Sequence, residues 1–139
     1  QYLRHLGLSD RDLLAMADDM TLVNQVLLPR LCQKCRKPFR INDSDSVATW
    51  VEHRKADIPP KTWTTSGCQH CQNTGYVGMA LVAEVIRMDR LSMSKVLDCR
   101  HDEAWEALRQ PDMRSMLQAA MELAAQGKIS LEDVAARRL

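Results

Sequence analysis

The sequence predicts an α+β protein, in which a lobe that contains β-strands and a cluster of cysteines is followed by a helical C-terminal lobe. Two Cys-x-x-Cys pairs are separated by 32 residues. A run rich in Thr and a β-branched apolar run border the second pair and indicate strands. The last third of the chain has apolar residues at helical spacing, and only 4% of all residues are aromatic, which favours a core of small aliphatic side chains between helices.

The first element, in the domain 1–30, is predicted to be one helix over about Ser9–Leu28. Ser9 and Asp10 are residue types that favour the N-cap of a helix. Apolar residues then recur at helical spacing. Pro29 ends the helix, because the residue before a proline is pushed out of the α conformation. We therefore expect a helix that leads into the first cysteine pair.

The region 31–88 is predicted to be a metal-binding subdomain built from short elements. A short helix is expected at 47–54, and a strand at 62–65 leads into the second cysteine pair. The stretch 58–60 contains two prolines and is expected to be extended. The apolar run 79–86 predicts a largely buried strand.

Two glycines and one carboxylate stand out around this last strand. Gly75 and Gly78 predict a bend with positive φ or a close approach of the backbone. Glu84 lies within the apolar run. Its side chain either leans towards the sheet edge or pairs with another polar group.

The region 89–139 is predicted to be a helical subdomain. Asp89 is placed to cap a first helix, and a second helix is expected over 102–109. Gly127 marks the end of a third helix, and Ser130 is the expected N-cap of a closing helix. The apolar stripe of the third helix is more typical of core packing than of a partner-binding groove, and it consists of Met113, Met116, Leu117, Ala120 and either Leu123 or Ala124.

The paired cysteines predict a structural zinc site, so that the first lobe is stapled by zinc. A Cys-x-x-Cys turn places two thiolates on one side of a tight loop, and two such turns complete the tetrahedral shell that holds structural zinc. The predicted ligands are Cys32, Cys35, Cys68 and Cys71, whereas Cys99 and the histidines are not expected to be ligands. A closed shell leaves no position for a substrate, so this zinc would stabilise the fold and not catalyse a reaction.

Other interpretations of the cysteines stay open. Disulfides form in oxidising compartments, and we expect no export of this chain. A redox dithiol usually occurs as a single pair, and here there are two. Iron accepts the same four thiolates, so ligand type alone does not separate iron from zinc. The basic residues after the first cysteine either offset the negative charge of a metal tetrathiolate or form a solvated loop.

Composition and missing motifs exclude several kinds of site. The net charge is +1 with acidic and basic residues mixed along the chain, which argues against a nucleic-acid surface. The sequence has no run of 18 apolar residues, so no transmembrane helix is predicted. It lacks the phosphate-binding pattern G-x-x-x-x-G-K-[ST] and the patterns G-x-G-x-x-G, H-E-x-x-H and G-x-S-x-G. We therefore predict no catalytic and no nucleotide-binding residues.

The motifs form an ordered set along nearly the whole chain. They are Leu31-Cys32-x-x-Cys35, Gly67-Cys68-x-x-Cys71-x-Asn73-Thr74-Gly75-Tyr76-x-Gly78, Glu84-Val85 and Gly127-Lys128-Ile129-Ser130-Leu131-Glu132-Asp133-Val134. Each Cys-x-x-Cys pair alone is unspecific, but the ordered set is specific. It resembles the C-terminal region of the secretion ATPase family, whose members drive type II secretion and type IV pilus assembly in bacteria.

The resemblance implies that the chain is a fragment of a larger ATPase. Residues 1–30 would be the end of the ATPase core, 31–88 the tetracysteine metal-binding subdomain and 89–139 the helical C-terminal subdomain. ATP and magnesium would bind only in the parent protein, and this chain would be inactive alone. The family implies a hexamer that is cytoplasmic and peripheral to the bacterial inner membrane, with a platform protein of that membrane as its partner.

The chain departs from the family pattern at three positions that are usually basic. Val26, Val77 and Met79 stand there. The change leaves open whether the parent ATPase is fully active and whether neighbouring subunits keep the contacts that arginines would make. The competing interpretation is a stand-alone zinc-knuckle module that binds protein or RNA. Few aromatic residues and a low net charge count against RNA.

Overall fold

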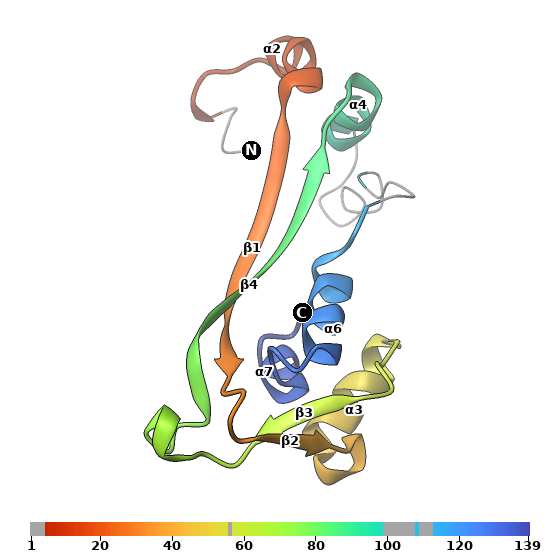
Figure 1. Ribbon diagram of the computed structural model, residues 1–139. Coiled ribbons are helices and arrows are strands. Elements are labelled where there is room, and N and C mark those ends of the chain that lie inside the picture. The colour runs from red at the N-terminus through yellow and green to blue at the C-terminus, as the bar shows by residue number, and fades with distance from the viewer. Residues whose placement is uncertain (1–4, 56, 99–107, 109–112) are drawn as a thin grey trace. The chain divides into compact units, whose positions relative to one another are not determined.

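The computed structural model describes residues 5–55, 57–98, 108 and 113–139, and these combine helices with small sheets (Figure 1). The α-helices are α2 (Asp10–Ala15), α3 (Asp45–Arg54), α4 (Arg90–Asp98), α6 (Met116–Ala125) and α7 (Leu131–Ala136). The 3-10 helices are η1 (Ala17–Asp19), η2 (Ile41–Asp43) and η3 (Gln69–Cys71). The strands are β1 (Thr21–Leu31), β2 (Arg36–Phe39), β3 (Thr62–Thr65) and β4 (Tyr76–Arg87). The predicted mixture of α and β structure is confirmed.

The strands form two separate sheets of two strands each. β1 pairs with β4, and β2 pairs with β3. The β2–β3 pair is antiparallel, with Arg36 opposite Thr65 and Phe39 opposite Thr62. The second sheet therefore starts directly after the first cysteine pair and ends directly before the second.

The chain packs as two compact units, each built from two stretches of sequence. These stretches are Gln1–Asn24 with Glu84–Arg114, and Gln25–Ala83 with Ser115–Leu139. The region 89–139, predicted as one helical lobe, is thus divided, since α4 belongs to the first unit and α6 and α7 belong to the second. As subdomains of a longer protein, 1–30, 31–88 and 89–139 stay predictions.

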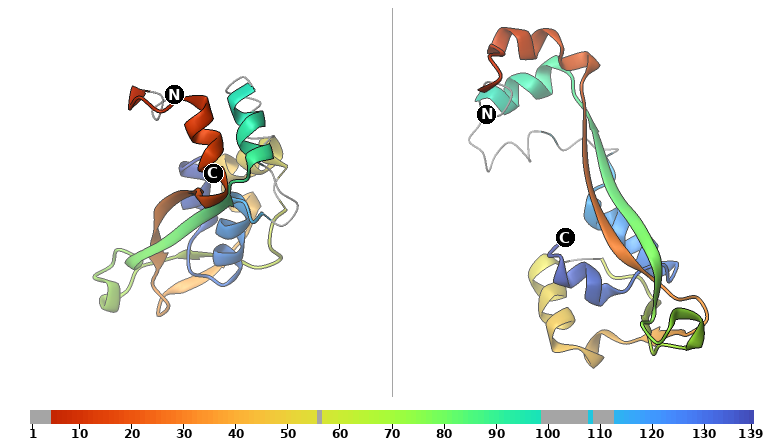
Figure 2. Two further views of the ribbon diagram at one scale, coloured as in Figure 1. Left: turned by 90° about the horizontal axis from the view of Figure 1, so that it is seen from above. Right: turned by 90° about the vertical axis from the view of Figure 1, so that its left-hand side faces the viewer.

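The first unit holds a small helical core, and its predicted caps are confirmed. The Ser9 hydroxyl accepts a hydrogen bond from the Asp12 N–H at 3.3 Å, and the Asp12 carboxylate accepts one from the Ser9 N–H at 2.9 Å. The Asp89 carboxylate begins α4 by accepting a hydrogen bond from the Ser92 N–H at 2.7 Å. α2 and α4 lie side by side (Figure 2). The buried residues of this core are Leu13, Ala17, Ile86, Met88, Met93 and Leu108.

The predicted helix over Ser9–Leu28 is wrong in its second half, because Thr21–Leu31 forms strand β1. The apolar residues from 22 to 28 fit helical spacing, but the β-branched side chains of Thr21, Val23 and Val26 favour a strand once a partner strand is available. Pro29 lies inside β1 and does not end a helix there. A two-stranded sheet leaves each strand one free edge, where the missing N–H of proline is tolerated.

The second unit packs α6 and α7 onto the core that α3 and the strands also share. The predicted helix at 47–54 and strand at 62–65 are confirmed as α3 and β3. The buried residues of this core are Leu28, Phe39, Val47, Val82, Ala119, Ala120, Met121, Ala124, Ile129, Leu131 and Val134. Of the predicted apolar stripe, Ala120 is buried in this core and three residues pack against it, namely Met116, Leu117 and Leu123, whereas Met113 packs against the core of the first unit.

β4 is a strand, as predicted, but it is covered on one face only. Val82 and Ile86 are buried, whereas Val77, Met79 and Leu81 are 44–55% exposed. Successive side chains of a strand point to opposite faces. A largely buried strand was the wrong expectation, because a two-stranded sheet packed on one side leaves its other face open.

Two expectations lie outside the described residues. Cys99 and, apart from Leu108, the predicted helix over 102–109 belong to this part of the chain. Within the residues that are described, no helix is both long enough and apolar enough to cross a membrane.

Candidate metal centre

The first cysteine pair forms a tight turn directly after β1. The carbonyl of Cys32 accepts hydrogen bonds from the Cys35 N–H at 3.3 Å and from the Arg36 N–H at 3.0 Å. The Cys32 N–H donates in turn to the Gly75 carbonyl at 2.8 Å. The backbone of the first pair is thus tied to the segment that follows the second pair.

The second cysteine pair forms a turn around η3. The Cys68 carbonyl accepts hydrogen bonds from the Cys71 N–H at 3.2 Å and from the Asn73 N–H at 2.8 Å. Gly67 has a φ of +78°, and a Cβ there would lie 2.7 Å from the Asn73 carbonyl oxygen. Only glycine allows the chain to approach itself this closely before Cys68.

Gly75 lets β3 approach the second pair, as the sequence predicted. Its φ is +81°, and a Cβ at this position would lie 2.3 Å from Cγ2 of Thr65. Thr65 is the last residue of β3, and β3 pairs with β2 directly after Cys35. The glycine therefore allows the two cysteine turns to meet.

The four predicted sulfur atoms come together. All four Sγ atoms lie within 4.8 Å of one another. The separations are 3.9 Å for Cys32–Cys68, 3.8 Å for Cys35–Cys71 and 3.7 Å for Cys68–Cys71. A regular tetrahedron with metal–sulfur bonds of about 2.3 Å has sulfur–sulfur edges of about 3.8 Å. The cluster therefore has the dimensions of a metal tetrathiolate, and it can hold a metal ion such as zinc.

None of these separations is that of a disulfide. A disulfide bond is about 2.05 Å long, and all four cysteines are free thiols. Cys32 and Cys71 are buried, whereas Cys35 and Cys68 are partly exposed. Two of the candidate ligands thus lie in the protein interior and two lie near the surface.

Hydrogen bonds to sulfur surround Cys71 and Cys35. The Cys71 Sγ accepts from the N–H groups of Cys68 and Gly75, both at 3.2 Å. The Cys35 Sγ lies 3.2 Å from Oγ1 of Thr65. Donors aimed at sulfur stabilise a thiolate, which is the form that binds a metal.

The environment moves the pKa values of the second pair in opposite directions. Burial acts to raise the pKa of Cys71, but the hydrogen bonds from Cys68 and Gly75 outweigh it and lower the pKa from 9.0 to about 6. A backbone hydrogen bond from Cys71 acts to lower the pKa of Cys68, but burial and the thiols of Cys35 and Cys71 raise it to about 11. Of these two thiols, Cys71 is the one whose surroundings favour the thiolate, which is the form that binds a metal.

Three residues around the cluster carry contacts that the sequence did not reveal. Thr65 contacts a ligand sulfur, as described above. Gln33 and Arg36 face the C-terminal end of α6: Arg36 donates through Nη1 to the carbonyls of Gln126 at 2.8 Å and Gly127 at 3.0 Å. The guanidinium also stacks on the Trp63 ring at 4.6 Å from its centroid. Arg36 is one of the basic residues that were expected either to offset metal charge or to form a solvated loop, and the structure shows that it caps a helix.

Glu84, in the first unit, pairs with a neighbouring amide. Its Oε1 accepts a hydrogen bond from Nδ2 of Asn24 at 3.0 Å, and the side chain is 9% exposed. The interpretation as a paired carboxylate is therefore supported, and the partner is a residue of β1.

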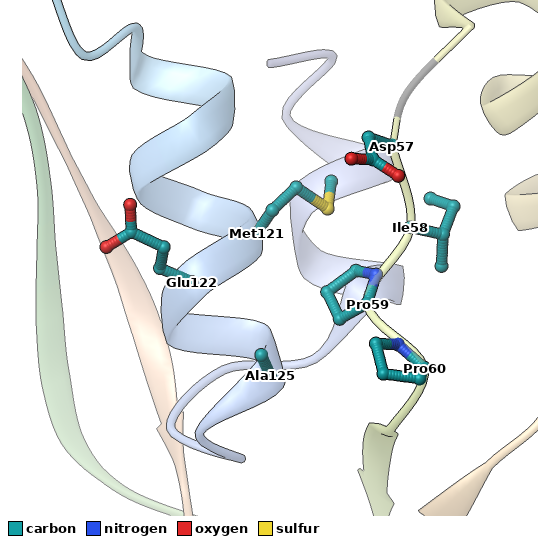
Figure 3. Close-up of a pocket in the computed structure, with 7 residues that line it drawn as sticks. All are labelled: Asp57, Ile58, Pro59, Pro60, Met121, Glu122 and Ala125. Atoms are coloured by element: carbon teal, nitrogen blue, oxygen red, sulfur yellow. The ribbon is translucent and has the colours of Figure 1, made fainter.

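A small groove in the second unit is the other concave feature near these elements (Figure 3). Its volume is about 260 Å³, and it lies between α6 and the extended stretch that contains Pro59 and Pro60. Met121 points towards the prolines, whereas Glu122 points away from them. Five of its seven lining residues are apolar, and the other two are Asp57 and Glu122.

Comparisons with known proteins assign the family. The family model described as "Type II/IV secretion system protein" matches residues 1–136. A curated relative, "Type II secretion system protein E" from Aeromonas hydrophila, is 26% identical over 117 residues, which cover 83% of this chain. The chain spans 22% of the length of that relative. Because the family model matches nearly the whole chain, the chain belongs to the type II/IV secretion system protein family.

Proposed function

We propose that this chain acts as the C-terminal portion of a hexameric ATPase motor that powers type II protein secretion or type IV pilus assembly, and that it contributes a structural zinc centre to that motor. The observation that carries the proposal is the family match over residues 1–136, together with four sulfur atoms at the separations of a metal tetrathiolate. The name of the Aeromonas hydrophila relative supports type II secretion as the process.

The proposed zinc would be held by Cys32, Cys35, Cys68 and Cys71. Four thiolates close a tetrahedral shell, so the ion has no open position for water or substrate. When bound, it would supply structural cross-linking and no chemistry. Two of the ligands are buried, which fits an ion inside the fold and not one exchanging at the surface.

The ATPase activity is proposed for the parent protein and not for these residues. The sequence contains no phosphate-binding loop. ATP and magnesium would bind to the parts of the motor that correspond to the remaining length of the relative. The other subunits of the hexamer and a platform protein of the bacterial inner membrane are the proposed partners, which would place the motor at the cytoplasmic face of that membrane.

Metal analysis of the purified chain tests the zinc centre. Elemental analysis by mass spectrometry should find about one zinc per chain, and Cys68→Ser should lower the zinc content to a small fraction of that. One iron per chain, or metal-free protein with two disulfides by mass, would contradict the proposal. Calorimetric titration with Mg-ATP should detect no micromolar site, because no phosphate-binding loop is present.

A cellular experiment tests the motor. The variant Cys68→Ser, introduced into the chromosomal gene of the host, should abolish secretion of exported enzymes or the assembly of pili. Lys37→Gln is the matched control, because Lys37 is an exposed residue of β2 beside the cluster. If the zinc is present and its loss leaves both secretion and piliation normal, a stand-alone zinc-knuckle module becomes the better explanation.

A further inference from the structure

We infer that metal binding at the four cysteines controls the docking of the C-terminal end of α6 onto the first cysteine turn. The segment that docks, residues 125–131, is called the α6–α7 corner below. The inference rests on the proposed function, since it presupposes that a metal binds the cysteines. It adds a conformational role to the site: the metal state decides whether this corner is held or released.

The carbonyls at the end of α6 and directly after it find their partners beside the first cysteine pair. The chain leaves the helix here, so these carbonyls have no partner within it. Here the carbonyl of Gly127 accepts hydrogen bonds from Nε2 of Gln33 and from Nη1 of Arg36, both at 3.0 Å. The carbonyl of Gln126 accepts a further bond from Arg36 at 2.8 Å. The positive guanidinium also opposes the negative end of the helix dipole.

Backbone and ring contacts extend the same interface. The Leu31 N–H donates to the Lys128 carbonyl at 2.8 Å, and Nε1 of Trp63 donates to the Ala125 carbonyl at 3.4 Å. Four consecutive carbonyls, from residue 125 to residue 128, are therefore bound by donors from outside the helix. Together the donor residues form a receptor for this one helix end, and they are Leu31, Gln33, Arg36 and Trp63.

Three of the four donor residues of this receptor belong to the cysteine turn or flank it. Gln33 lies between the two cysteines of the first pair, and Leu31 and Arg36 are the residues on either side of that pair. Their positions depend on the turn between Cys32 and Cys35, which a bound metal would fix by joining both sulfurs to the second pair. Besides the metal, the turn is held by the backbone hydrogen bonds to the Cys32 carbonyl, by the Cys32 N–H bond to the Gly75 carbonyl, and by a bond from Oγ of Ser66 to the Cys35 carbonyl at 3.3 Å.

The α6–α7 corner fits this receptor closely. Gly127 has a φ of +66°, and a Cβ there would lie 2.3 Å from Nη1 of Arg36. The helix ends in a Schellman motif, with the Gly127 N–H bonded to the Ala124 carbonyl and the Lys128 N–H to the Leu123 carbonyl, both at 2.9 Å. The corner itself contains buried Ile129 and Leu131, so its release would loosen the core that α6 and α7 share.

Amide hydrogen exchange of the 139-residue chain, with zinc bound and after zinc removal by a chelator, tests the inference. Zinc removal should speed exchange over residues 117–131 by at least about tenfold. Exchange in α4, which belongs to the first unit, should stay unchanged. Unchanged protection over 117–131 after verified zinc loss would overturn the inference and leave the zinc proposal standing. Loss of protection throughout the chain, including α4, would also overturn the inference, because it would show that zinc stabilises the whole chain and not this corner in particular.

The variant Arg36→Gln separates the receptor from the metal itself. It should keep about one zinc per chain and still lose protection over 117–131, because the guanidinium that binds two carbonyls is gone. Lys37→Gln is the control and should behave like the wild type. If Arg36→Gln retains wild-type protection, the inference is wrong. A wild-type chain that binds no zinc at all would overturn the proposed function and this inference together.

Discussion

The hydroxyl of Thr65 offers a sharp test of how the protein supports the metal. Its Oγ1 lies 3.2 Å from the Cys35 Sγ and accepts a long hydrogen bond of 3.3 Å from the Gly67 N–H, which leaves the hydroxyl proton free to donate to the sulfur. Thr65→Val removes this donor and nearly preserves the shape of the side chain that packs against Gly75. The variant therefore removes the hydrogen bond to the Cys35 sulfur together with the acceptor of the Gly67 N–H.

We expect Thr65→Val to weaken zinc binding by about 10–100-fold, which is the usual effect of losing a group that supports a metal ligand. In free energy this is about 1.4–2.7 kcal/mol, within the range of roughly 1.5–3 kcal/mol for a hydrogen bond to a charged group. Competition with a chromophoric chelator measures the affinity, and cobalt substitution reports the thiolate-to-metal absorption band. Thr65→Ser, which keeps the hydroxyl, is the control. An affinity for Thr65→Val within about twofold of wild type would refute the reasoning.

Three further substitutions test other parts of the structure. Gly75→Ala should lower the free energy of unfolding by about 2–3 kcal/mol in urea titrations, because the new Cβ would meet the Thr65 side chain at a positive φ; a loss under about 0.5 kcal/mol would show that the chain relaxes there. Cys68→Ser should speed amide exchange in β2, β3, α6 and α7. Exchange in α2 and α4 should stay slow, since the first unit has its own core. Slow exchange in α6 and α7 of this variant would instead support a helical lobe that folds separately from the cysteine region. Asn24→Ala should cost about 1 kcal/mol of thermal stability by removing a hydrogen bond to the Glu84 carboxylate, and no measurable cost would mean that other partners satisfy Glu84.

The features that the sequence predicted correctly depend on neighbours in the chain. Ser9, Ser130 and Gly127 were identified as helix caps from their residue type and place, and the structure confirms each one. Capping involves residues only a few positions apart, so a local pattern contains the necessary information. The two Cys-x-x-Cys pairs were informative for the same reason, because each turn is a local structure.

The features that were wrong or missed depend on residues far apart in sequence. The stretch 21–28 has apolar residues that fit a helix, and it became a strand because β4 supplies a partner; Asn24 and Glu84, which bond across this pair, are 60 positions apart. Arg36 likewise gained its role from carbonyls 90 and 91 positions away. Propensity is a weak guide where tertiary contacts of this range decide the outcome.

The unusual distance between the cysteine pairs also has a structural explanation. The 32 residues between them contain β2, α3 and β3, and they contribute Phe39 and Val47 to the core of the second unit. Doubling the length of a loop adds only about 0.6 kcal/mol to the cost of closing it. The long segment between the pairs therefore adds buried apolar surface. Its extra length adds little to the entropic cost of bringing the two pairs together around a metal.

The metal and this core are expected to depend on each other. Three of the eleven buried core residues of the second unit are alanines from α6, and each alanine buries little apolar surface. Structural zinc contributes roughly 10–16 kcal/mol in small domains, whereas a whole domain is stable by only about 5–15 kcal/mol. The second unit should therefore lose much of its stability when the metal is removed. The first unit has its own core, and its described residues include none of the candidate metal ligands. Metal loss should therefore destabilise the second unit and not the first, so that the two units unfold in separate transitions.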